Sequence, residues 1–187
     1  MEKLYVVEFQ FADRSFFCLW YTDDTDGLIS EEGKLIKFDS IIELKAYVKE
    51  KELSLGTGVT TYNIEHLEKQ LENGLKHVDC EEVLLFWNIS LDISNSIACP
   101  FLGTDNFHHI YEKLFYGNNL PAINRSDEKY VPTWSGEEMH DIKNVVSDGV
   151  SILKKRIASI EYLKKLNAAY FKGYFTGDKR SIDLYYE

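Results

Sequence analysis

The N-terminal part of the chain alternates apolar and polar positions in the way that is typical of β-strands. Residues 3–11 and 15–22 are rich in aromatic and β-branched side chains, and a short turn at residues 12–14 separates them. This pattern predicts a β-hairpin. Residues 34–38 predict a third short strand, and the polar, acid-rich stretch before them predicts a loop.

The apolar period then lengthens to that of a helix. Ser40 and Glu43 have the spacing of a capping box, and apolar residues follow at helical intervals, so we expect a helix to start at Ser40. Residues 53–61 contain two glycines and show little periodicity, which predicts a connecting loop. Residues 1–52 should therefore form a small antiparallel sheet with one helix packed on it.

Helical periodicity dominates the rest of the chain. Polar caps predict helix starts at Asn63, Asp79 and Ser135. A further apolar helix, with Phe107 on its apolar face, is expected after the breaks at Pro100 and Gly103. The helix that follows Asp79 is the most hydrophobic and should be central to the core. The last helical pattern runs toward Phe171, with a break expected near Gly149 or Ser159.

These segments together predict an α+β fold, with a small N-terminal antiparallel sheet and one helix followed by a larger all-helical body. We expect a single domain over residues 1–187. It would comprise the sheet and helix at 1–52, the helical body at 62–175 and a C-terminal tail at 176–187. A chain of 187 residues can bury a substantial core without disulfides or a structural metal.

The central helix carries one polar stripe, made of Asn88, Asp92, Asn95 and Ser96. Short polar side chains suit either close helix packing with hydrogen bonds or a shallow recognition strip. Packing is the favoured interpretation.

The chain is acidic, and its charge is unevenly spread. The formal net charge is −10, but residues 1–150 hold 13 Lys and Arg against 27 Asp and Glu, a balance of −14. Residues 151–187 hold 8 basic against 4 acidic residues, a balance of +4. A negative field repels nucleic acid and attracts cationic partners, although solubility alone also explains an acidic surface. The 12 Tyr, 11 Phe and 3 Trp add aromatic anchors of the kind found in protein interfaces.

Candidate catalytic and metal-binding chemistry is sparse. Cys18, Cys80 and Cys99 share no metal-ligand spacing, and we expect inert thiols in a reducing compartment. No two of the five histidines stand at i, i+4, and no nucleotide-binding motif is present, so neither a metal nor another cofactor is expected. The N-terminus has no signal-peptide pattern, and no apolar run approaches the ~20 residues of a membrane span. We therefore expect a cytoplasmic protein without a membrane partner.

Three runs in the second half of the chain carry a family resemblance. They contain Phe86–Asn88, Lys113–Pro121 and Tyr130–Trp134, within the segment Asp79–Asp148. These elements resemble a group of immunity proteins from bacterial contact-dependent growth inhibition systems. The resemblance implies a cytoplasmic, non-enzymatic inhibitor that binds the C-terminal toxin domain of a cognate exoprotein, commonly a nuclease, and covers its active site. It brings no catalytic residues, and we expect no direct nucleic-acid binding and a monomer apart from the toxin complex.

The candidate toxin-binding residues combine aromatic anchors with nearby carboxylates. The stretch after Tyr21 is dense in like charge, and a cationic partner would relieve the repulsion, although a solvated extension is an equally simple account. Glutamates in the first turn of a helix also stabilise the helix itself. The candidates are Trp20, Tyr21, Asp23, Asp24, Asp26, Glu31, Glu32, Glu81 and Glu137.

Two other functions stay open at this point. One is a small cytosolic enzyme whose site is assembled from scattered residues near 99–111, namely Cys99, Asp105, His108 and Tyr111. The other is a scaffold that self-associates through amphipathic C-terminal helices. Convergence of those four side chains in a deep pocket would favour the enzyme, whereas an acidic convex or shallow face would favour the inhibitor.

Overall fold

The structure is a computed structural model that describes residues 3–22, 24–73, 78–104, 106–125 and 128–159. Five helices and seven strands occur in these described residues. The strands are β1 (Lys3–Gln10), β2 (Ser15–Tyr21), β3 (Gly27–Leu28), β4 (Ser30–Glu31), β5 (Lys34–Lys37), β6 (Ser54–Asn63) and β7 (Ile157–Ser159). The helices are α1 (Ile41–Glu50), α2 (Ile64–Glu72), α3 (Cys80–Ser96), α4 (His108–Gly117) and α5 (Gly136–Lys155).

The strands form two sheets. A four-stranded sheet has the order β3-β2-β1-β6, in which β1 pairs antiparallel with β2 and parallel with β6. A three-stranded sheet has the order β4-β5-β7, in which β5 and β7 are parallel. The predicted hairpin is β1–β2, and its seven residue pairs run from Leu4–Tyr21 to Gln10–Ser15.

The expected fold class is wrong in how it divides the chain. Strands are not confined to the first 52 residues, because β6 and β7 join the sheets from segments predicted to be a loop and part of the helical body. β6 is an edge strand whose residues are mostly exposed, so no apolar alternation marks it. The predicted acidic loop also contains β3 and β4, with Leu28 completely buried.

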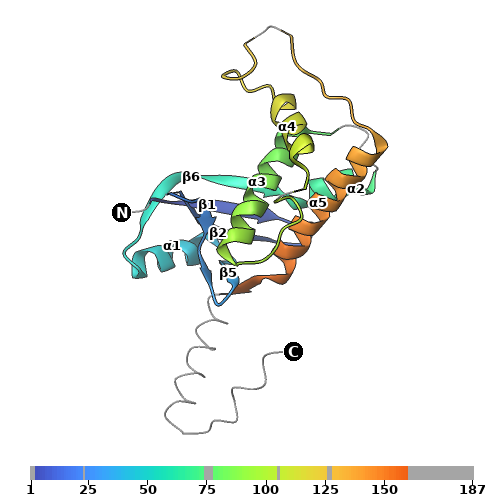
Figure 1. The fold of residues 1–187 in the computed structure, drawn as a ribbon. Helices are drawn as coiled ribbons and strands as arrows, with labels where there is room; N and C mark the ends of the chain where they lie inside the picture. The colour runs from blue at the N-terminus through green and yellow to red at the C-terminus, as the bar shows by residue number, and fades with distance from the viewer. Residues whose placement is uncertain (1–2, 23, 74–77, 105, 126–127, 160–187) are drawn as a thin grey trace, which may run out of the picture.

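Two hydrophobic cores lie on opposite faces of the four-stranded sheet. The larger core packs α2, α3, α4 and α5 against side chains such as Val7 and Phe9 of β1. The smaller core packs α1 and β5 against Leu4 and Val6, the alternate residues of the same strand. Figure 1 shows α1 on one side of the sheet and α3 with α5 on the other.

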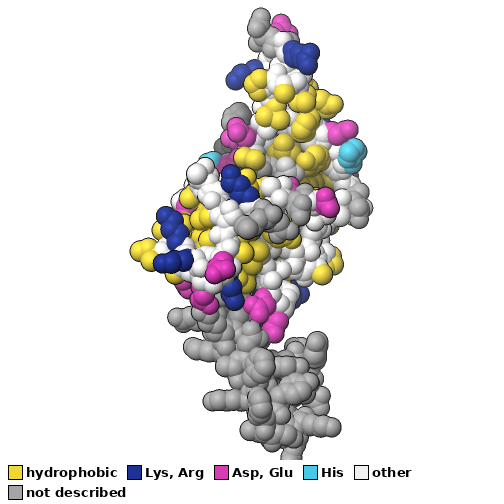
Figure 2. Space-filling view, turned by 90° about the vertical axis from the view of Figure 1, so that its left-hand side faces the viewer, with side chains coloured by type: hydrophobic (Ala, Val, Ile, Leu, Met, Phe, Trp, Pro, Cys, Tyr) yellow, Lys and Arg dark blue, Asp and Glu magenta, His cyan; other side chains and the backbone are white. Residues whose placement is uncertain are grey.

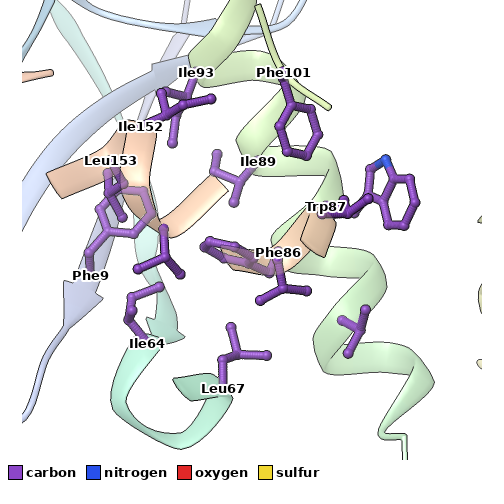
Figure 3. Packing of buried hydrophobic residues seen from close by; sticks show 14 of the residues in the cluster. Phe9, Ile64, Leu67, Phe86, Trp87, Ile89, Ile93, Phe101, Ile152 and Leu153 are labelled. Carbon is purple, nitrogen blue, oxygen red and sulfur yellow. The ribbon is translucent and has the colours of Figure 1, made fainter. Parts of the chain in front are cut away.

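α3 is the centre of the larger core, as its hydrophobicity predicted. Figure 3 shows Phe86 directed from α3 into the region lined by Phe9 and Ile64, with Trp87 on the flank beside Phe101. Trp87 is buried, packs edge-on against Phe101 and Tyr111, and donates its indole N–H to the Gly103 carbonyl at 3.1 Å.

The predicted helix starts at Ser40, Asn63, Asp79 and Ser135 are confirmed. Each of these side chains accepts a hydrogen bond from the backbone N–H three residues later. The break expected near Gly149 does not occur, since α5 runs through this residue to Lys155, and β7 follows at Ile157–Ser159. Gly149 allows close contact with α3, where an added Cβ would lie 2.5 Å from Ser90 Oγ. The helical course predicted beyond residue 159 and the tail at 176–187 lie outside the described residues.

Candidate protein-binding surface

The segment between α4 and α5 projects from the body and carries a cluster of exposed apolar side chains. We call residues 116–131 the arm, of which 126 and 127 lie outside the described residues. Five of its large apolar side chains are between 40% and 77% exposed: Tyr116, Leu120, Ile123, Tyr130 and Val131. Figure 1 shows the projection at the top of the molecule, and Figure 2 shows hydrophobic side chains gathered over it.

One asparagine holds the two limbs of the arm together. Asn119 Nδ2 donates to the carbonyls of Gly117 and Tyr130, at 2.7 and 2.9 Å. Its Oδ1 accepts from the Tyr130 backbone N–H at 2.7 Å and from Asn124 Nδ2 at 2.8 Å. Asn119 has a φ of 52°, a left-handed conformation that asparagine tolerates better than most residues. These bonds brace the arm, although its described residues contain no regular secondary structure beyond the end of α4.

The base of the arm is fixed by the side chain of Lys113 and by close packing at Gly117. Lys113 Nζ donates to the Thr133 carbonyl at 2.6 Å and to Glu138 at 2.7 Å, and it lies 4.8 Å from the centre of the Trp134 ring. At Gly117 an added Cβ would lie 2.5 Å from Cys80 Sγ and 3.0 Å from Pro132. Only a glycine allows α4 to end this close to α3 and to the returning limb.

Carboxylates surround this base. Glu138 completes the capping box of α5, and its hydrogen bonds with Lys113 and Ser135 lower the pKa of its carboxyl below the ordinary value. The neighbouring Glu137 is exposed in the first turn of α5. Glu81 is exposed in the first turn of α3, next to the Cys80 thiol that faces Gly117. Two of the predicted acidic candidates thus stand beside the base of the arm.

The other acidic candidates lie in the hairpin region of β2 to β5. Asp24 and Asp26 are exposed in the connection after β2, and Glu31 is half-buried at the end of β4. Glu32 is exposed in the β4–β5 turn with a φ of 52°. Asp23 lies outside the described residues. Asp24, Asp26, Glu31 and Glu32 therefore belong to the β2–β5 region and not to the arm.

Trp20 and Tyr21, predicted as anchors, are both half-buried and contact the body of the protein. The Trp20 indole N–H donates to Asp92 Oδ2 at 2.9 Å, and its ring packs against Tyr5 at a centroid distance of 5.6 Å. The Tyr21 hydroxyl lies against Gly27, where an added Cβ would be 2.5 Å away. The polar atom of Trp20 is therefore already used within the fold.

Three of the four residues of the polar stripe on α3 serve packing, as favoured from the sequence, whereas Asn95 is exposed. Besides the bond from Trp20 to Asp92, Ser96 Oγ accepts from the Leu28 backbone N–H at 2.8 Å, and Asn88 accepts from the Tyr111 hydroxyl at 2.9 Å. Burial raises the pKa of Asp92, the Trp20 hydrogen bond opposes this, and the Asp26 charge adds to the rise. Burial and the Asp92 charge raise the pKa of Tyr62 to about 12.

The three runs that carry the family resemblance meet around the arm. Phe86–Asn88 of α3 contacts α4 through Trp87 and Asn88, both of which touch Tyr111. Lys113–Pro121 and Tyr130–Trp134 are joined by the bonds of Lys113 and Asn119 described above. Lys113 and Asn119, which belong to these runs, therefore hold the arm in position.

Sequence reasoning missed the exposed apolar residues of the arm. Its candidates were chosen by charge and by aromatic rings beside charge, and Leu120, Ile123 and Val131 have neither. A usable signal was present: these residues fall in a stretch marked by Asn, Gly and Pro, which cannot continue a helix. Apolar residues there have no helical stripe through which to reach the core.

The residues proposed for an enzymatic site engage different partners. The Tyr111 hydroxyl bonds Asn88, while His108 is exposed and lies 3.4 Å from Glu112 on its own helix. Cys99 is half-buried, and Asp105 lies outside the described residues. Cys18 and Cys80 are buried, and burial raises the pKa of both thiols.

No three His, Cys, Asp or Glu side chains are grouped so that they could hold a metal ion in the part of the chain that the structure describes. Among the described helices, none combines the length and the apolar character needed to cross a membrane.

Comparison with known proteins shows a likeness of fold only. The chain is similar to the crystal structure of the C-terminal domain of SatS in complex with bromine, with a TM-score of 0.52 and 15% sequence identity. The likeness covers 83% of this chain and 93% of that domain. No protein-family model matches the sequence, and no curated protein matches it.

Proposed function

We propose that this chain is an immunity protein that binds and neutralises a basic bacterial toxin domain, of the nuclease kind, by covering its active site. The ordered apolar arm carries the proposal. A soluble protein gains nothing in stability by holding five large apolar side chains in water on a braced projection. Such side chains become favourable when a partner buries them, and clusters of this kind supply the anchors of protein interfaces.

The charge of the body supports a basic partner. A nuclease presents Lys and Arg to hold phosphates, and the balance of −14 over residues 1–150 favours fast approach of such a surface. Glu81 and Glu137 place carboxylates beside the base of the arm. The arm itself carries the basic residues Arg125 and Lys129. We therefore assign its contribution to binding to its apolar residues and not to its charge.

The proposal is tested with a pair of arm substitutions and a matched control. Ile123→Ser with Val131→Ser removes two apolar contacts, and Val131 is 77% exposed. Fully burying such a side chain contributes about 1.5–3 kcal/mol, so the partly exposed pair should contribute about 2–4 kcal/mol to binding. This corresponds to roughly a 30-fold to several hundredfold weaker Kd. Ile42→Ser is the control, because Ile42 is 78% exposed but lies on α1, away from the arm.

Cells would express each variant together with the toxin domain encoded by the gene immediately upstream. The arm variant should melt like the wild type and lose protection, while Ile42→Ser should protect fully. Association of the wild type should also slow as ionic strength rises, with little change in dissociation. Full protection by the arm variant would refute the role of the arm, and an upstream gene without a toxin domain would refute the proposed function.

The acidic candidates are compared in the same assay. One variant neutralises Asp23, Asp24, Asp26, Glu31 and Glu32, and a second neutralises Glu81 and Glu137. If the toxin is held at the arm, the second variant should weaken protection more per charge removed, because its carboxylates adjoin the apolar anchors. A larger loss of protection from the first variant would show that the toxin binds the β2–β5 region instead.

A further inference from the structure

The outer edge of β6 is long, and no strand of the described part of the chain pairs with it. β6 has ten residues and is the last strand of its sheet, where it pairs with β1 alone among the described strands. Seven of its ten residues are exposed, including Val59, which is 50% exposed. The unpaired backbone groups of such an edge can bind another strand.

The opposite edge of the same sheet is closed. β3 has only two residues, and the Leu28 backbone N–H donates to Ser96 Oγ of α3 at 2.8 Å. Short edge strands and covering helices are the usual protection against pairing between molecules. Within the described ranges, one edge of the sheet is therefore protected and the longer edge is not.

β6 also lacks the charged residues and prolines that usually prevent pairing. No Asp, Glu, Lys, Arg or Pro occurs between Leu53 and Ile64. The first half of the strand is irregular, because the register with β1 shifts between Leu4 and Val6 and Gly58 has a φ of 91°. The second half, Val59–Asn63, pairs regularly with Val6–Gln10 and forms the straight part of the edge.

We infer that a second copy of this chain pairs with the Val59–Asn63 edge of β6 in antiparallel orientation. The argument is one of charge: at a net charge of −10, two copies repel wherever acidic surfaces meet, and β6 offers an uncharged line of contact. Pairing centred on Thr61 places Val59 opposite Asn63 and Thr60 opposite Tyr62, with no like charges facing each other.

The nearest carboxylates tolerate this arrangement. Glu8 accepts a hydrogen bond from Thr61 Oγ1 at 3.2 Å and lies on β1, one strand away from the edge. In the pair, the two copies of Glu8 would stand three strand spacings apart, about 14 Å. That separation exceeds the Debye length of about 8 Å at physiological ionic strength.

The test measures the mass of the full chain by analytical ultracentrifugation over a wide range of concentration. The wild type should form a dimer as concentration rises. Thr61→Lys should weaken the dimer about tenfold or more, because two lysines then face each other across the axis. Glu8 can pair with this lysine inside one copy, so the substitution should not unfold the protein.

Thr22→Lys is the matched control, since it adds the same charge at an exposed threonine away from β6. It should dimerise like the wild type, and amide hydrogen exchange at Val59–Asn63 should slow with concentration in both. A wild type that stays monomeric at all concentrations would overturn the inference. A Thr61→Lys variant that dimerises like the wild type would do the same, and would place any contact between copies elsewhere.

Discussion

Replacing Asn119 should open the arm while leaving the body folded. The Asn119 side chain makes four hydrogen bonds that join the end of α4 to the returning limb at Tyr130 and to Asn124. Asn119→Ala removes all four. The main core does not include this residue, so the loss should appear as local opening rather than global unfolding.

The size of the effect follows from the number of bonds. Each contributes about 0.5–1.5 kcal/mol net, and because they share one residue the total for closing the arm should be about 2–4 kcal/mol. The open population should then rise by roughly 30-fold to several hundredfold. Alanine at a φ of 52° adds backbone strain, which Asn119→Gly would avoid while still losing the bonds.

Hydrogen exchange at the Tyr130 amide measures this opening, because that N–H donates to Asn119 Oδ1. Both Asn119→Ala and Asn119→Gly should lose most of the protection of this amide and should protect less well against the toxin. Asn118→Ala is the control, since no hydrogen bond of the Asn118 side chain occurs among the described contacts and only its backbone N–H caps α4. Unchanged exchange at Tyr130 in Asn119→Ala would refute the bracing role.

Two further predictions concern the body of the protein. Trp87→Ala should lower the free energy of unfolding by about 3–5 kcal/mol in urea titrations, because the side chain is buried and its indole bond to Gly103 is lost; a variant as stable as the wild type would show that Trp87 does not belong to the core. Burial raises the pKa of Asp92 above its ordinary 3.8, so the folded chain binds this proton more readily than the unfolded chain. The contribution of Asp92 is therefore present below pH 3.8 and is lost as pH rises through the raised value. Asp92→Asn keeps an acceptor for Trp20, and its stability relative to the wild type should rise across that window and then level off; parallel pH profiles would contradict this.

The helices were predictable because their signals are local. Ser40, Asn63, Asp79 and Ser135 each cap a backbone N–H three residues away, and the apolar stripe that follows lies on the same helix. The β1–β2 hairpin was predictable for the same reason, since a short turn joins two alternating strands. A pattern within ten or so residues contained the physical information in each case.

The parallel pairing of β1 with β6 depended on contacts far apart in the sequence. Apolar and polar residues do not alternate along β6, because its side chains are mostly exposed. The segment forms a strand because it pairs with the edge of β1. The sequence places Leu28 in an acidic loop. In the structure its backbone N–H donates to Ser96 Oγ of α3, 68 residues away.

The candidate surface likewise depends partly on local sequence and partly on contacts between distant residues. The sequence alone showed the acidic balance, the first-turn glutamates Glu81 and Glu137, and the runs that meet around the arm. Tertiary structure decided that Trp20 bonds Asp92 across 72 residues, and that Ile123 and Val131 stay in water. Whether an apolar or aromatic side chain is buried depends on what packs over it, and local sequence does not contain that neighbour.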